Sequence, residues 1–377
     1  MTRGWYPANR VVGPSVLRHE DFLATRRFPV LDGLRAIAIL LVVTAHPAYA
    51  HIWPVFHGTA GVSLFFVLSG FLITTLCLRE QDVSGRLSLS SFYIRRAFRI
   101  YPLYLLVLAL YVVLIVGLGQ EALRRHAFVI NVPYMLAFFP EHAFFFNHTG
   151  VAVPFDGAWS LGVEEKFYLI WPALGILLLK NRLRLVLLCL VIAASLIFNT
   201  RSADWARALA PYGLIAFGCV AAVLLHHRRS YEFCSRLGRP RTLLLLAITT
   251  ICIQFGTREV NTGRTLYVAY GAVLAALLVG LITYSGDAIR WLHSRPMVLI
   301  GRISYALYLL HNFGLNAMER LIPRTHGFIG SLVSTSLGLA ASGVVAWILN
   351  VWFEMPLTRL GHRIAHTTKA LRSLPAD

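Results

Sequence analysis

The chain has 377 residues, of which 57% are hydrophobic and only 14% are charged. Soluble domains carry about 25% charged residues, so this composition excludes an ordinary soluble protein. The formal charge of +18 is divided among short basic segments between long apolar runs, a pattern that indicates a helical membrane protein and excludes nucleic acid as a partner.

Ten apolar stretches are long enough, or nearly so, to cross a bilayer as helices. In chain order they lie at about 29–49, 58–78, 100–118, 163–180, 184–198, 209–226, 242–256, 266–284, 297–319 and 329–351. The sequence therefore predicts an all-α, multi-pass membrane bundle of about ten helices. Residues 1–27 form an N-terminal segment, 28–360 the membrane domain and 361–377 a C-terminal tail.

Lysine and arginine are unevenly shared between the loops on the two sides of these spans. The side of the N-terminus holds 25 of them and the opposite side holds 8. Because positively charged loops stay in the cytoplasm, both termini are predicted to be cytoplasmic, in a bacterial inner membrane whose lipid is one partner. Residues 119–162 then lie outside and are expected to fold back on the bundle as a lid.

The first span, LDGLRAIAILLVVTAH (31–46), carries Arg35 near its start and His46 near its end. Eleven residues are three helical turns, so the two side chains share one helix face and lie roughly 16 Å apart along the axis. An arginine in hydrocarbon costs at least about 2.5 kcal/mol, so Arg35 is expected to face a cavity or a partner. The alternative is that Arg35 binds lipid phosphates while His46 caps the helix.

The segment FYIRRAFRIYPLY (92–104) contains an arginine cluster at the cytoplasmic end of a span. Arg96 and Arg99 are three residues apart and point the same way on a helix. Guanidinium groups bind phosphates through forked hydrogen bonds, so the cluster suits a phosphorylated ligand. The competing interpretation is an ordinary anchor for anionic lipid.

Acidic residues within the spans are few. Glu164, in GAWSLGVEEKFYLIWP (157–172), shares a helix face with Tyr168, and Lys166 is expected to pair with an acid on another helix. Glu354 lies in WFEMP, near the end of the last span. A carboxylate inside a span favours a cationic partner, whereas the nearby aromatics are equally well explained as interfacial residues.

No spacing typical of a metal site, a P-loop or a GxSxG hydrolase occurs in the sequence, so we predict no bound metal and no resident cofactor. The cysteines show neither disulfide-framework nor CxxC spacing and are predicted to be small core residues. They are Cys77, Cys189, Cys219, Cys234 and Cys252.

Taken in order, these motifs resemble the acyltransferase 3 family of integral membrane acyltransferases over residues 28–360. They are Arg35-x10-His46, GVSLFFVLSGFLIT (61–74) with Ser69, the RxxR of Arg96 and Arg99, WSLGVEEKFY (159–168), ISYALYLLH (303–311) and FEMP (353–356). Lys166 departs from the pattern, in which glutamine is more usual. Many members carry an additional SGNH hydrolase-like domain, and the chain is expected to resemble the stand-alone members.

The resemblance implies transfer of an acyl group, usually acetyl, from acyl-CoA to a hydroxyl, commonly on a sugar of an envelope or secreted glycan. Acyl-CoA is then a co-substrate whose phosphates bind to Arg35, Arg96 and Arg99. His46 is expected to be the general base, because a neutral imidazole exists at working pH. Glu164 is expected to orient the site or balance its charge.

The remaining motif residues are expected to support the site. A hydrogen bond to the developing oxyanion is expected from Tyr168, Ser160 or Trp159. Further supporting residues are Ser69, Tyr305, His311 and Glu354, although His311 is equally explained as a satisfied buried histidine. Proteins of glycan assembly are candidate partners.

Two alternative functions remain open from the sequence. One is acylation of a small molecule such as a macrolide on the cytoplasmic side. The other is a glycan or lipid-carrier transporter whose path is lined by Arg35, Glu164 and Glu354. The lack of a visible internal repeat counts against transport.

Overall fold

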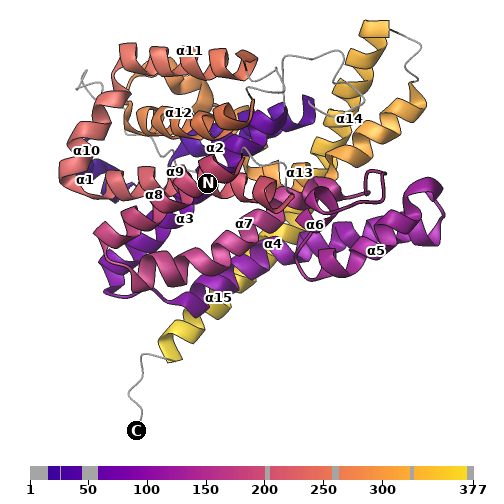
Figure 1. Cartoon of the computed structure of the whole chain (residues 1–377), viewed down its shortest axis with the longest axis horizontal. Coiled ribbons are helices and arrows are strands. Elements are labelled where there is room, and N and C mark those ends of the chain that lie inside the picture. Colours follow the sequence, from indigo (N-terminus) through magenta and orange to yellow (C-terminus); the bar gives the residue numbers. More distant parts are fainter. Residues whose placement is uncertain are drawn as a thin grey trace, which may run out of the picture.

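The computed structural model describes residues 16–25, 27–44, 58–199, 204–256, 263–322 and 327–371. Within these ranges every regular element is helical, and no strand is present beyond one isolated bridge between Val16 and Tyr284 (Figure 1). The α-helices are α1 (His19–Ala24), α2 (Pro29–Thr44), α3 (Gly58–Ser84), α4 (Leu89–Val112), α5 (Arg125–Leu136), α6 (Glu141–Phe145), α7 (Trp159–Trp171), α8 (Asn181–Asn199), α9 (Asp204–His226), α10 (Arg228–Cys234), α11 (Pro240–Gly256), α12 (Gly263–Thr283), α13 (Arg295–Leu321), α14 (Gly327–Leu349) and α15 (Met355–Leu371).

Short π-helices extend three of these helices, at Val113–Gly117 after α4, Pro172–Leu178 after α7 and Asn350–Glu354 between α14 and α15. Pro172 lacks a backbone N–H and so cannot continue the regular hydrogen-bond ladder of α7, which gives the local change of winding a physical cause.

Each of the ten predicted spans overlaps a helix, namely α2–α4, α7–α9 and α11–α14, and residues 45–49 of the first span lie outside the described residues. Among the described residues, five helices are long and apolar enough to cross a membrane by themselves. The outer helices expose much of this apolar surface: only 17% of the apolar window in Asn181–Phe198 is buried in the protein. A surface of this kind requires lipid rather than water, so the chain is a multi-pass membrane protein.

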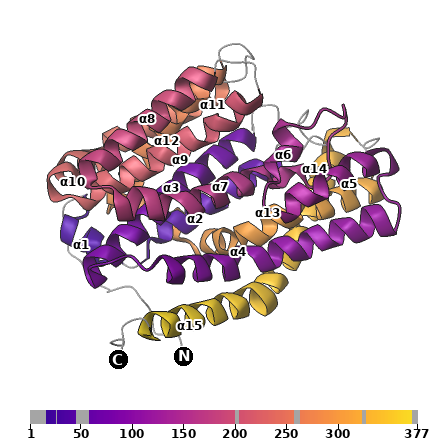
Figure 2. The ribbon, with the colours of Figure 1, turned by 60° about the horizontal axis from the view of Figure 1, so that its bottom comes forward.

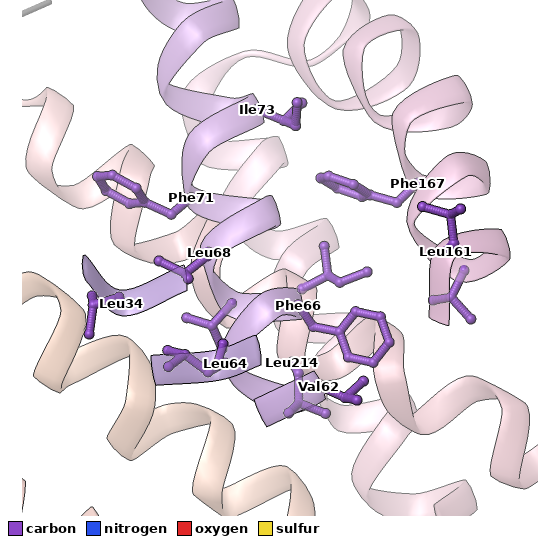
Figure 3. Close-up of a cluster of buried hydrophobic side chains, with 14 of the residues drawn as sticks. Leu34, Val62, Leu64, Phe66, Leu68, Phe71, Ile73, Leu161, Phe167 and Leu214 are labelled. Atoms are coloured by element: carbon purple, nitrogen blue, oxygen red, sulfur yellow. The ribbon is translucent and has the colours of Figure 1, made fainter. Parts of the chain in front are cut away.

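Helix α3 lies at the centre of the bundle and packs against α2, α7 and α9. Gly70 of α3 and Gly218 of α9 face the partner backbone with no room for a Cβ, so the two helices approach closely as small residues allow in membrane bundles. Figure 3 shows the apolar side chains of this core: Leu34, Val62, Leu64, Phe66, Leu68, Phe71, Ile73, Leu161, Phe167 and Leu214.

The cysteine prediction is wrong at two positions. Cys77, Cys219 and Cys234 are buried, as expected, but Cys189 on α8 and Cys252 on α11 are exposed. Both helices lie at the periphery of the bundle, where an apolar residue faces outward as readily as inward (Figure 2). Hydropathy alone does not distinguish the two faces of such a helix.

The segment between α4 and α7 folds back on the bundle, as expected for residues 119–162. The backbone of α6 packs against α7, and Gly162 of α7 has no room for a Cβ beside Glu141. The buried Glu141 carboxylate forms an ion pair with Lys166 of α7, which also donates to the Phe138 carbonyl at 3.2 Å. Lys166 therefore does pair with an acid on another helix.

Replacing Lys166 with methionine is expected to lower the free energy of unfolding by about 3 kcal/mol, because the Glu141 carboxylate would remain buried without its cation. Denaturant titration of the purified protein in detergent micelles measures this loss. Adding Glu141→Gln should recover most of it, and strictly additive losses in the double variant would contradict a stabilising pair.

The predicted orientation has a direct test in two exposed positions. Leu123 is 93% exposed between α4 and α5, and Val83 is 88% exposed at the end of α3. In a chain freed of its native cysteines, a membrane-impermeant maleimide should label Leu123→Cys in intact cells. Val83→Cys should react only after permeabilisation, and the reverse pattern would invert the topology.

Candidate functional site

Arg35 lies on α2 with its side chain 23% exposed, one helical turn after Asp32. Its Nη1 atom is 3.6 Å from Asp32 Oδ1, and Arg27 Nη2 donates to Asp32 Oδ2 at 2.6 Å. Asp32 is buried, and Gly301 of α13 packs against its backbone carbonyl with no room for a Cβ. Asp32 is thus a shared acid for two arginines, a role that the i, i+3 spacing in LDGLR could have indicated.

Glu164 faces Tyr168 across one turn of α7, as the helix spacing predicts. The Tyr168 hydroxyl donates to Glu164 Oε2 at 2.6 Å and lies 3.0 Å from Ser69 Oγ on α3. Trp171 donates from Nε1 to Thr74 Oγ1 at 2.9 Å, which fixes the same face of α7 against α3. Two helices therefore position the carboxylate.

Two arginines, Arg35 of α2 and Arg96 of α4, act electrostatically on this carboxylate, and Arg99 of α4 acts on both of them. The Arg96 guanidinium lies 5.4 Å from the centre of the Tyr168 ring, within cation–π range. Arg35 interacts electrostatically with Arg99, Tyr168 and Glu164. We name this group the polar cluster; it comprises Arg35, Ser69, Arg96, Arg99, Glu164 and Tyr168.

A cavity of about 490 Å³ adjoins the polar cluster and shares Arg96 and Arg99 with it. Arg95, which also lines it, pairs with Glu80 at 3.1 Å, whereas Arg96 and Arg99 form no ion pair with any described residue. We name it the arginine cavity; its lining is Leu76, Cys77, Glu80, Ser91, Phe92, Arg95, Arg96, Arg99, Thr358, His362, Ala365 and His366.

Glu354 extends the polar region toward the end of α14. Its side chain is buried, and Oε2 accepts a hydrogen bond from Asn350 Nδ2 at 3.0 Å. It interacts electrostatically with Arg99 and Tyr305, so the charge of Arg99 is opposed by a carboxylate on a third helix segment.

The other supporting candidates make contacts within the protein. Ser160 Oγ lies 2.8 Å from the Tyr308 hydroxyl, which donates to the Gly157 carbonyl. The Tyr305 hydroxyl donates to the Ile100 carbonyl at 2.6 Å. These bonds hold α13 against α4 and α7. The oxyanion role of Ser160 and the supporting role of Tyr305 stay predictions.

His311 and Trp159 make contacts with residues outside the polar cluster. His311 is buried, and its Nδ1 atom lies 2.7 Å from the Tyr308 carbonyl of its own helix. Trp159 stacks on Phe144 with ring centres 4.9 Å apart and contacts Phe66 edge-on. His46 lies outside the described residues, beyond the last described residue of α2, so its assignment as general base also stays a prediction.

The sequence prediction did not assign a role to Glu165. This residue is buried beside Glu164, interacts electrostatically with Tyr101, and leaves its Oε1 atom without a hydrogen-bond partner among the described residues. The adjacent acids of EEK were the available signal. No group of three or more histidine, cysteine, aspartate or glutamate side chains suited to a metal was found in the described part of the chain.

Comparison with known proteins agrees with this picture. The chain is 30% identical over 318 residues to the putative peptidoglycan O-acetyltransferase YrhL of Bacillus subtilis, covering 76% of this chain and 48% of the relative. It is 27% identical over 361 residues to the peptidoglycan O-acetyltransferase OatA of Listeria monocytogenes, covering 88% and 56% respectively. The chain thus spans about half the length of these relatives. No solved structure matches it significantly.

A family match covers nearly all of the bundle. Residues 28–351 match the acyltransferase 3 family, whose members share a region described as an acyltransferase domain. The match includes the polar cluster on α2, α3, α4 and α7 and ends within the π-helix that precedes α15. The chain belongs to the acyltransferase 3 family.

Proposed function

We propose that the chain transfers an acetyl group from acetyl-CoA to a hydroxyl of an envelope glycan of the peptidoglycan type. The observation that carries this proposal is the polar cluster adjoining the arginine cavity. Arg35 and Arg96 act there on the partly buried carboxylate of Glu164, and Arg96 and Arg99 also face a space large enough for a ligand.

An acyl-CoA donor explains why arginines gather at this site. Coenzyme A is anionic, and guanidinium groups bind its phosphates through paired N–H donors. Arg96 and Arg99 would bind these phosphates, while Arg95 is already neutralised by Glu80. The extended pantetheine arm has a reach comparable to the roughly 16 Å between Arg35 and His46 on a helix.

The transfer step follows from the residue types. His46 takes the proton of the acceptor hydroxyl as its oxygen attacks the thioester carbonyl. The carbon–sulfur bond breaks, the ester forms, and the proton passes to the departing CoA thiolate. Glu164 balances the arginine charges and accepts a hydrogen bond from the Tyr168 hydroxyl. Tyr168 is the candidate for a hydrogen bond to the developing oxyanion.

The acceptor class comes from the relatives, two of which are named for peptidoglycan O-acetylation. Glycan hydroxyls are weak nucleophiles at neutral pH, which is why the reaction needs a base and a stabilised oxyanion. An acceptor in the envelope also fits a protein that is embedded in a membrane.

Isolated membranes supplied with radiolabelled acetyl-CoA test this function. Label should enter the glycan fraction with the wild type, and His46→Ala at equal expression should lower incorporation about 10²–10⁴-fold. Equal incorporation by both would reject His46 as the base. Label in a small cytoplasmic product instead of the glycan would reject the acceptor, and failure with every acyl donor would reject the enzymatic assignment.

A further inference from the structure

One wall of the arginine cavity is formed by residues that belong to none of the family motifs. Helix α15 contributes Thr358, His362, Ala365 and His366 to its lining. Thr358, His362 and His366 are four residues apart and Ala365 lies three after His362, so the four side chains share one face of the helix. The cavity is therefore bounded by α3, by the arginines of α4 and by one face of α15.

Helix α15 is held in place by close contacts with α4, beside which it lies in both views (Figures 1 and 2). Gly361 sits against the Phe98 side chain with no room for a Cβ, and Ser91 Oγ donates to the Ala365 carbonyl at 3.0 Å. His362 and His366 flank these contact points, yet both are exposed. A dissolved ligand can reach them without movement of the helix.

The charges around the cavity favour an anion. Glu80 is the single acid of the lining, and Arg95 neutralises it. Arg96 and Arg99 add two guanidinium groups to the lining, although Glu164 and Glu354 oppose their charges from outside it. Each imidazole supplies a nitrogen that donates a hydrogen bond. A phosphate placed between the two helices would thus meet guanidinium donors from α4 and imidazole donors from α15.

We propose that His362 and His366 of α15 bind the phosphate groups of coenzyme A opposite Arg96 and Arg99. Helix α15 thereby completes the donor site as its second phosphate-binding wall. This inference rests on the proposed function, because it takes coenzyme A as the ligand. It adds to the family's arginine motif two residues that lie beyond the region matched to the family.

The test measures the affinity of the purified chain for coenzyme A in nanodiscs of zwitterionic lipid by calorimetry. A hydrogen bond to a charged group is worth about 1.5–3 kcal/mol, so loss of either imidazole should raise the Kd for coenzyme A about 10- to 150-fold, and His362→Ala/His366→Ala should raise it at least about 100-fold. The affinity for pantetheine, which has no phosphate, should stay the same in this variant.

A matched control lies on the same helix. Arg359 and Arg363 are exposed and do not line the cavity, so Arg359→Gln/Arg363→Gln removes two full charges while leaving the site intact. Its Kd for coenzyme A should stay within about twofold of the wild type, since exposed charges contribute little. In the wild type, bound coenzyme A should also protect both histidines from diethylpyrocarbonate, a measurement that needs no variant.

The outcomes separate the two proposals. Binding of coenzyme A by the wild type with an unchanged Kd in the histidine variant would overturn the role of α15 and leave the acyltransferase function standing. No binding by the wild type would overturn both. Displacement of coenzyme A by phosphatidylglycerol added to the nanodisc, dependent on the two histidines, would assign the cavity to a lipid headgroup and reject the proposal.

Discussion

Glu164→Gln is expected to lower the rate of acetyl transfer by about 10²–10³-fold, the loss typical of removing an electrostatic group from a preorganised site. The substitution keeps the size of the side chain and a hydrogen-bonding partner for Tyr168. It removes the negative charge that opposes Arg35 and Arg96 of the polar cluster. The effect should therefore appear in kcat more than in the KM for acetyl-CoA.

Two variants make this result interpretable. Tyr168→Phe removes the hydroxyl that links Glu164 to Ser69 and should cost only about tenfold, the worth of one hydrogen bond. Glu232→Gln makes the same chemical change at an exposed position of α10 and should leave the rate unchanged. A Glu164→Gln enzyme with wild-type kcat would remove the carboxylate from the mechanism.

Arg35→Ala is expected to lower kcat/KM by more than about 100-fold, because loss of one partner from a partly buried charge cluster costs about 3 kcal/mol. Asp32 keeps Arg27 as a partner at 2.6 Å, so the substitution leaves the ion pair at the start of α2 in place. The group that loses its cation is Glu164. Arg35→Lys keeps the charge without the guanidinium fork and should recover part of the activity.

The control for Arg35 is Arg27, the other partner of Asp32. Its side chain is 56% exposed, and an exposed ion pair contributes at most about 1 kcal/mol, so Arg27→Ala should retain activity within a few-fold. Thermal unfolding in detergent checks that both proteins are folded. Equal losses of activity in Arg27→Ala and Arg35→Ala would indicate that Asp32, rather than Glu164, is the partner that matters.

Most of the architecture was predictable because length and hydropathy determine what crosses a bilayer. Even the two shortest predicted spans, 184–198 and 242–256, correspond to complete helices, α8 and α11. The hydropathy pattern did not predict which side of each outer helix points away from the bundle, and there Cys189 and Cys252 are exposed. In lipid, an outward apolar residue costs nothing, so the sequence carries little signal for it.

In the candidate site, contacts within one helix were predictable from the sequence, whereas contacts between helices were not. Contacts within one helix, such as Glu164 with Tyr168, follow from the helical repeat and were predicted. The identity of partners across helices depends on packing that no local pattern encodes, and so Glu141 as the acid for Lys166 was not predicted. The contribution of α15 to the arginine cavity was missed for the same reason.

Acetyl transfer is tested most directly with purified protein in nanodiscs, radiolabelled acetyl-CoA and a soluble peptidoglycan fragment. One free CoA thiol should be released for each labelled ester formed on the fragment, and both products should be lost together in Glu164→Gln and Arg35→Ala. Release of CoA without a labelled glycan, or a labelled glycan formed equally well by both variants, would contradict the proposed function.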